Sequence, residues 1–341
     1  MRMTQKEVTF ALVRDPGQLE SVSGRKAGGN GTLSTLVSGG SGLLGEARSP
    51  MPGGVLRPSS SSWTQQLTRY LLLACLLSTS APATELKKET LDAFERYVRL
   101  TEARIDGELQ PGKPFLWVDG LPEAHRDLAY TQLRQGQVVI ERVKTLDNGK
   151  DIEVPGGLIH HWKGAVFIPG ATLKSTLALV QDYDHHEQIY KPEVIRSKLL
   201  RRDGNDFTIF LRFLKKKVIA VVLNTEHDVH YFSVDATRTY SRSMTTRIAE
   251  VEDASEPDGP EKPAGQDHGF LWRLNSYWRF QEKHGGVYLE CEAVSLTRGI
   301  PAVLAWLIRP FVSSIPKESL SNALGSTRAA LMKQSSPADG R

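Results

Sequence analysis

The sequence predicts an α+β fold in which a curved antiparallel sheet of about seven strands wraps around a long C-terminal helix, with an N-terminal helical extension. Three observations lead to this prediction: two patterned strands that meet at a glycine turn, a series of extended runs before them, and an apolar-faced helix after them. Strands that follow one another in the chain pair as antiparallel hairpins, and the closing helix must bury its apolar face on the sheet.

The strand pair near the C-terminus carries the clearest pattern. Apolar and polar residues alternate over 272–280 and again over 287–293. Because successive side chains of a strand point to opposite faces, each run presents one apolar face. A turn at 284–285 places Phe280 opposite Leu289, so that apolar meets apolar. The pattern predicts a hairpin in this register.

The other predicted elements follow in chain order. The extension, 84–157, is predicted to hold helices at 84–105 and 122–134 and short strands at 137–143 and 151–154. The main domain, 158–335, is predicted to hold a helix at 171–182 and strands at 158–168, 193–201, 206–214, 218–231 and 236–251. An apolar helical run covers 301–312. Pro310 and Pro316 are expected to break or restart it, and a helix with an apolar face covers 316–331.

Charge and composition narrow the class of protein. The chain has 341 residues, 40% of them hydrophobic and 24% charged, which is typical of a globular protein. Residues 1–83 hold eight Lys/Arg and four Asp/Glu, so 35 of the 43 basic and 35 of the 39 acidic residues remain in 84–341. Residues 84–341 therefore carry no net charge, which argues against a nucleic-acid partner.

A leader precedes the folded part. Two arginines, an apolar core at 70–77 and the small-residue site Ala81-Pro82-Ala83 describe a secretory signal peptide over 51–83. Translation that starts at Met51 fits this position, and the Gly/Ser-rich residues 1–50 are disordered if they are made. The expected location is therefore periplasmic or extracellular. Two alternatives stay open: a lipid anchor through Cys75, and a cytoplasmic protein whose leader is not used.

Two short segments carry a family resemblance. Residues 182–194, which read Asp-Tyr-Asp-His-His-Glu-Gln-Ile-Tyr-Lys-Pro-Glu-Val, resemble the helix-to-strand corner of the START-like (SRPBCC) superfamily, of the polyketide cyclase/dehydrase and lipid-transport type. Residues 315–320 resemble the start of its C-terminal gripping helix. The resemblance covers about 158–335, leaves 336–341 as a disordered tail, and implies a helix-grip fold. It also implies a cavity for lipids, sterols, isoprenoid quinones, plant hormones or polyketides, and a minority of the family are enzymes.

The candidate ligand-binding residues lie on three predicted strands. They are Phe207, Ile209, Leu211, Phe213, Tyr240, Arg242, Trp272, Leu274, Trp278 and Phe280. The apolar ones either line a cavity or form the core, and the sequence leaves both open. If Arg242 faces inward, it is a buried cation that seeks a partner, whereas on the outer face it is surface charge.

Nothing in the sequence assigns a reaction. The histidine and cysteine spacings match no metal site, no nucleophile elbow occurs, and no cofactor is indicated. We expect an exported binding or carrier protein for a hydrophobic small molecule. The alternatives are a cyclase/dehydrase-like enzyme that uses Tyr240, Arg242 or the His185-His186 pair for proton transfer, and an envelope interaction protein without a cavity. The run 303–312 allows peripheral membrane contact, and the oligomeric state stays open.

Overall fold

The computed structural model describes residues 86–216, 220–300 and 302–335, with the backbone alone for 302–313 and 335. These residues belong to one compact unit. The expectations for 1–83 and for the tail 336–341 fall outside the described residues and stay predictions.

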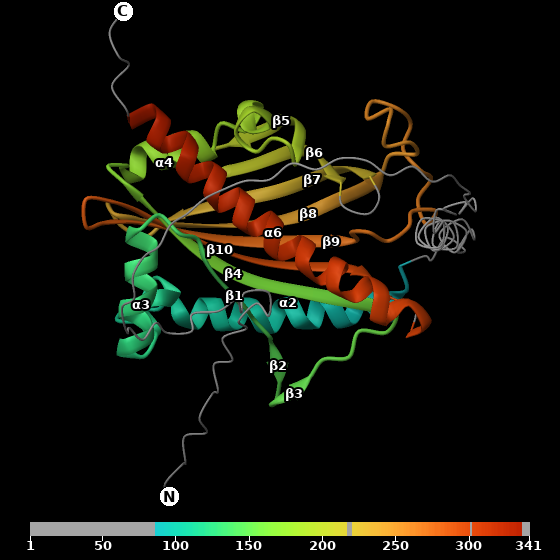
Figure 1. Ribbon diagram of the computed structural model, residues 1–341, viewed down its shortest axis with the longest axis horizontal. Coiled ribbons are helices and arrows are strands. Elements are labelled where there is room, and N and C mark those ends of the chain that lie inside the picture. The colour runs from blue at the N-terminus through green and yellow to red at the C-terminus, as the bar shows by residue number, and fades with distance from the viewer. Residues whose placement is uncertain (1–85, 217–219, 301, 336–341) are drawn as a thin grey trace, which may run out of the picture. The chain divides into compact units, whose positions relative to one another are not determined.

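One antiparallel sheet of eight strands dominates the structure, in the order β1-β4-β10-β9-β8-β7-β6-β5 (Figure 1). The strands are β1 (Val139–Arg142), β4 (Gly157–Pro169), β5 (Val194–Asp203), β6 (Asp206–Lys216), β7 (Ala220–Ser233), β8 (Arg238–Glu250), β9 (Arg273–Lys283) and β10 (Gly286–Arg298). The main domain supplies β4 to β10, which are the seven strands that the sequence predicts. The extension adds β1 at one edge, beside β4. A separate hairpin joins β2 (Leu146–Asp147) to β3 (Lys150–Asp151).

The helices occupy both faces of this sheet. They are α2 (Lys88–Glu108), α3 (Glu123–Arg134), α4 (Leu173–Val180), α5 (His186–Ile189) and α6 (Ala302–Ser335), with 3₁₀ turns η1 (Trp117–Gly120) and η2 (Tyr183–His185). Figure 1 shows α6, in red, running diagonally across the strands. We call the face that α6 covers the inner face and the opposite one the outer face.

The β9–β10 hairpin has the predicted register. Phe280 lies opposite Leu289, and Arg279 lies opposite Glu290. His284 and Gly285 form the turn with φ of 55° and 74°. Such values are those of a tight hairpin turn, which glycine adopts without strain.

The main core lies between the inner face and the C-terminal half of α6. Leu320, Leu324 and Leu331 of α6 are buried there with side chains from β4, β6, β7, β9 and β10. Gly164 of β4 lets the helix approach closely, because a Cβ at this position would lie 3.0 Å from Leu324 Cδ1. The sheet therefore grips the helix, as the resemblance implied.

The N-terminal extension covers the outer face of β4, β9 and β10. Phe94 and Ile105 of α2 are buried with Val294 and Leu296 of β10. The segment from η1 to α3 forms a second cluster, and its buried members are Phe115, Leu116, Val118, Ala129, Leu133, Ala165, Phe167 and Tyr288. The extension is thus part of the same packed unit as the sheet.

A different segment covers the outer face of β5 to β8. In the proline-rich connection between β8 and β9, Asp258 pairs with Arg212 of β6, and Glu261 pairs with Arg247 of β8. Lys262 donates to the buried Glu250 over 2.7 Å. These ion pairs fasten the connection to the sheet.

Two element predictions are wrong. The helix α6 is continuous from Ala302 to Ser335 and passes through Pro310 and Pro316. A proline removes one hydrogen bond and bends a helix, but packing can hold the helix together, and here the leucines of α6 that lie beyond both prolines are buried. The strand predicted at 151–154 ends at Asp151. Ile152 and Val154 instead pack against the α2 cluster, which is the group of buried side chains around Phe94 and Ile105.

Candidate functional site

Seven of the ten candidate binding residues share the inner face. Phe207, Ile209 and Phe280 are buried in the core that includes the leucines of α6. Leu211 and Trp278 pack against that core while partly buried. Phe213 and Leu274 occupy the same face of β6 and β9, because strand residues two or four apart point the same way. Two aromatic strand faces therefore meet at one surface.

These seven side chains divide into packed and accessible groups. Phe207, Ile209 and Phe280 are 2%, 3% and 1% exposed, so they act as core. Leu211, Phe213, Leu274 and Trp278 point toward the α6 side of the sheet but are only partly buried. These large apolar side chains still contact solvent although they lie on an inward face. A ligand that covered them would gain binding free energy from the apolar surface removed from water.

The other three candidates lie elsewhere. Tyr240 and Arg242 lie on the outer face, because they alternate with Ser241, which faces inward. There Arg242 pairs with Asp106 of α2, and its guanidinium lies 5.8 Å from the ring centroid of Phe232. The cation that could have met a ligand thus lies half-buried on the outer face, where it pairs with the extension. Trp272 precedes β9 and is buried in the α2 cluster, so its grouping with Trp278 is also wrong.

A stripe of polar side chains crosses the inner face and was not predicted. Ser243 of β8 lies directly opposite Ser276 of β9. His227 of β7 lies opposite Thr245, two residues along β8 from Ser243 and on the same face. On the far side, His160 of β4 lies opposite Ser295 of β10. The sequence does carry a signal for this stripe. Small hydroxyl residues, such as Ser241 and Ser243, occupy every second position of the strand between large side chains.

His227 is a buried titratable group of this stripe. It is 4% exposed, and burial lowers its pKa to about 4, so the imidazole is neutral near pH 7. Nε2 lies 2.9 Å from Thr225 Oγ1, and Nδ1 lies 3.5 Å from Ser243 Oγ. The ring therefore offers a neutral hydrogen-bonding edge on the face that α6 covers.

One edge of the inner face ties α6 to the sheet by charge. Lys215 of β6 pairs with Glu193 and donates to Ser319 of α6 over 2.8 Å. Asn322 of α6 donates to the same carboxylate over 2.7 Å. At the opposite edge Lys317 lies over the ring of Trp162 on β4. Contacts at both edges of the sheet therefore hold the same part of α6, from Lys317 to Asn322.

No family model and no curated protein matches the chain. Solved structures do match. The Zhui aromatase/cyclase from Streptomyces is 9% identical with a TM-score of 0.38, and the match covers 54% of this chain and 100% of that one. A STAR-related lipid transfer protein from Xanthomonas axonopodis is 16% identical with a TM-score of 0.36, covering 57% and 98%. The lipid transfer and protein localization domain of human StarD13 is 8% identical with a TM-score of 0.35, covering 62% and 98%.

At these identities a likeness concerns the fold alone. The element order of the chain is decisive: one strand, two short helices and a 3₁₀ turn, six antiparallel strands and a long helix gripped by the sheet. The chain has a START-like helix-grip fold. In this fold the extension with α2, α3 and β1 is an addition before the first strand.

The START-like corner at 182–194 is held by hydrogen bonds. Tyr183 and Tyr231 are buried and their hydroxyls lie 2.9 Å apart. The Asp184 carboxylate accepts from the Leu199 backbone N–H over 3.0 Å. His186 is bonded to the Val180 carbonyl, and its buried ring has a pKa lowered to about 4. The corner thus connects α4 to β5 as a structural unit.

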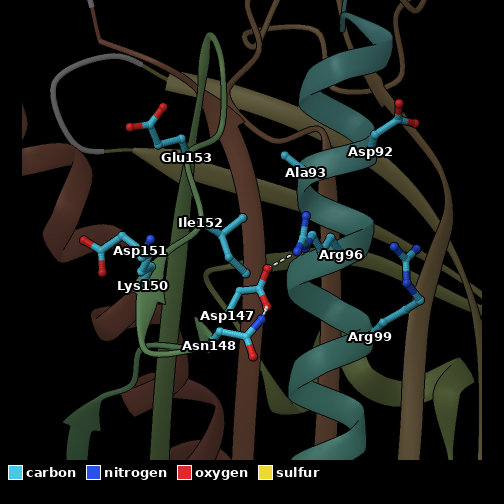
Figure 2. A pocket seen from close by; sticks show the side chains of 10 residues that line it. All are labelled: Asp92, Ala93, Arg96, Arg99, Asp147, Asn148, Lys150, Asp151, Ile152 and Glu153. Atoms are coloured by element: carbon cyan, nitrogen blue, oxygen red, sulfur yellow. Dashed lines mark hydrogen bonds and ion pairs between the residues drawn. The ribbon is translucent and has the colours of Figure 1, made fainter.

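Two clefts open on the surface of the described part of the chain. The larger, of about 690 Å³, lies between α2 and the β2–β3 hairpin. Figure 2 shows Arg96 of α2 reaching across it to Asp147 of the hairpin, with which it pairs. The second, of about 540 Å³, lies between α4 and the β7–β8 turn. Within the described residues no group of three or more histidine, cysteine, aspartate or glutamate side chains could hold a metal ion.

Helix length and hydropathy give one further finding. Across 86–335, leaving aside the undescribed gaps, no helix is both long and apolar enough to cross a membrane.

Proposed function

We propose that the protein binds and carries a hydrophobic small molecule between the inner face of the sheet and α6. The observation that carries this proposal is the set of large apolar side chains, Leu211, Phe213, Leu274 and Trp278, that point toward the helix side while only partly buried. A ligand that covers them would gain about 25 cal/mol for each Å² of apolar surface removed from water. Lipids, isoprenoids and polyketide-like molecules have suitable chemistry.

Carriage rather than catalysis fits the position of the polar groups. The groups that a cyclase would use for proton transfer were Tyr240, Arg242 and the pair His185-His186. The first two lie on the outer face, His185 is exposed beside Asp182, and the His186 ring is buried and bonded to a carbonyl. Tyr240 and Arg242 therefore lie away from the apolar surface that would hold a substrate, and both histidines of the corner already have hydrogen-bond partners.

We also propose that the protein works outside the cytoplasm. The apolar core at 70–77, its preceding arginines and the Ala81-Pro82-Ala83 site support cleavage after Ala83. N-terminal sequencing of the protein recovered from the periplasm or medium tests this. A mature chain that begins at Thr84 supports cleavage there, a lipid-modified Cys75 supports the anchor, and an intact leader on cytoplasmic protein contradicts export.

Native mass spectrometry of the protein purified from its own host tests ligand binding. The wild type should carry a hydrophobic molecule that organic solvent extracts. Ser276→Trp places a large ring on the accessible part of the inner face and should remove that molecule. Met244→Trp, on the exposed outer face of the neighbouring strand, is the matched control and should keep it. A ligand retained equally by both variants contradicts the proposed site.

A further inference from the structure

The hydrogen bonds around His227 determine its tautomer. The Thr225 hydroxyl donates its proton to the Leu211 carbonyl over 2.9 Å. A hydroxyl has one proton, so Thr225 Oγ1 must accept at its other contact, which is His227 Nε2 at 2.9 Å. The proton of the neutral imidazole therefore sits on Nε2, and Nδ1 is a bare acceptor.

This acceptor is poorly satisfied by the described residues. Its nearest partner is Ser243 Oγ at 3.5 Å, well beyond the usual range of 2.7–3.2 Å for a strong hydrogen bond. His227 itself is buried. A buried acceptor without a good partner costs free energy, and a donor that reached Nδ1 from the helix side would recover it.

The neighbouring side chains are neutral as well. Ser243 presents a hydroxyl beside His227, Ser276 lies opposite Ser243 on the next strand, and burial keeps the His227 ring uncharged. The charged groups at the rim of this face are already engaged: Lys215 pairs with Glu193, and Glu282 accepts from the Leu173 backbone N–H over 2.6 Å. Two further cations of this face, Arg202 and Lys317, lie over the rings of Phe207 and Trp162. The residues that pair with His227 on the neighbouring strands, Ile209 and Thr245, carry no charge.

We infer that the ligand is an uncharged hydrophobic alcohol whose O–H group donates to His227 Nδ1, with the Ser243 hydroxyl beside it. This rests on the proposed binding function and adds the chemical class of the ligand. A carboxylate or phosphate would bring a charge to a place that holds no counter-charge. A ketone or ether, having acceptors only, would leave Nδ1 without a donor.

Matched ligand pairs test the inference. The probes are farnesol with farnesyl methyl ether, and dehydroergosterol with its methyl ether, and binding is followed by tryptophan fluorescence. Each ether keeps the carbon skeleton and loses only the donor. The wild type should bind at least one alcohol tenfold or more tighter than its ether. His227→Leu should lose that preference and keep the affinity for the ether.

His230→Leu is the control, because His230 lies on the same strand with its side chain on the outer face, paired to Asp206. It should behave as the wild type. Equal affinity for alcohol and ether, or a preference that survives His227→Leu, overturns this inference and leaves the binding function standing. Failure of the protein to bind any of the four probes overturns both.

A spectroscopic measurement gives a second check that does not depend on the variants. The ¹⁵N shifts of the His227 ring should show the Nε2–H tautomer in the free protein. Addition of the preferred alcohol should shift Nδ1, and addition of the ether should not. A free protein with the proton on Nδ1 would overturn the inference.

Discussion

His161 on β4 and Glu292 on β10 form a buried hydrogen bond of 2.6 Å on the outer face, beneath α2. His161 Nδ1 lies 2.9 Å from the Tyr97 hydroxyl of that helix, and Glu292 also pairs with Arg104 of the same helix. Burial tends to raise the pKa of Glu292, but the bond to His161 and the charge of Arg104 outweigh it and lower the pKa to about 2. The N-terminal extension is therefore attached to the START-like sheet by charge as well as by apolar packing.

Glu292→Gln should destabilise the protein by about 3 kcal/mol, because the buried His161 and the half-buried Arg104 would both lose the carboxylate they bind. Urea unfolding followed by circular dichroism measures this. Asp92→Asn is the control, since Asp92 pairs with Lys88 on the exposed side of α2, where such pairs contribute little. A loss under 1 kcal/mol for Glu292→Gln would show that apolar contacts alone hold the extension.

Mild acid should destabilise the protein through its buried histidines. Burial lowers the pKa of His160, His186 and His227 to about 4 each, from an ordinary value of 6.5. As the pH falls, these histidines take up protons in the unfolded chain before they do so in the folded protein. Their contribution to the free energy of unfolding is therefore complete above pH 6.5 and is lost as the pH falls toward 4.

Urea midpoints at pH 7.5, 6 and 5 measure this loss. His227→Leu should lose less stability over that range than the wild type, because one of the three groups is gone. A wild-type midpoint that stays constant from pH 7.5 to 5 would contradict the neutral state of these rings.

Gly164→Ala should weaken the grip on α6. The added Cβ would lie 2.9 Å from Ile140 Cγ1 and 3.0 Å from Leu324 Cδ1, so the strand and helix must move apart. Overpacking of this kind costs about 1–3 kcal/mol. Thermal unfolding should show a lower midpoint.

Gly325→Ala in α6 is a matched comparison with the opposite sign. A Cβ there meets nothing within 4 Å, and the residue is helical. Alanine should stabilise the helix by about 0.5–1 kcal/mol. If both glycine variants changed stability in the same direction, the close approach at Gly164 would not be the cause.

Much of the fold could be predicted from local pattern. The register of β9 and β10 followed from the alternation around Phe280 and Leu289, because a one-residue slip would turn every apolar side chain to the other face. The continuity of α6 could not be predicted, since prolines are strong local signals and the buried leucines that hold the helix act through tertiary contacts.

The site was harder to predict than the fold. The β6 candidates were placed well because apolar alternation marks an inward face, as at Phe207 and Ile209. Tyr240 and Arg242 were misplaced because both faces of β8 carry polar residues, and only the pairing with β9 shows which face is inward. His227 was missed because a lone histidine in a strand gives no signal until Thr225 and Ser243 lie beside it.

The most direct test of the central claim is an isotope-filtered NOE experiment on labelled protein with its extracted ligand or the preferred probe bound. The ligand should give NOEs to the Leu274 and Leu211 methyl groups and to the Trp278 ring, all on the inner face. NOEs confined to Met244, Tyr240 or other outer-face protons, from a saturated complex, would contradict the account.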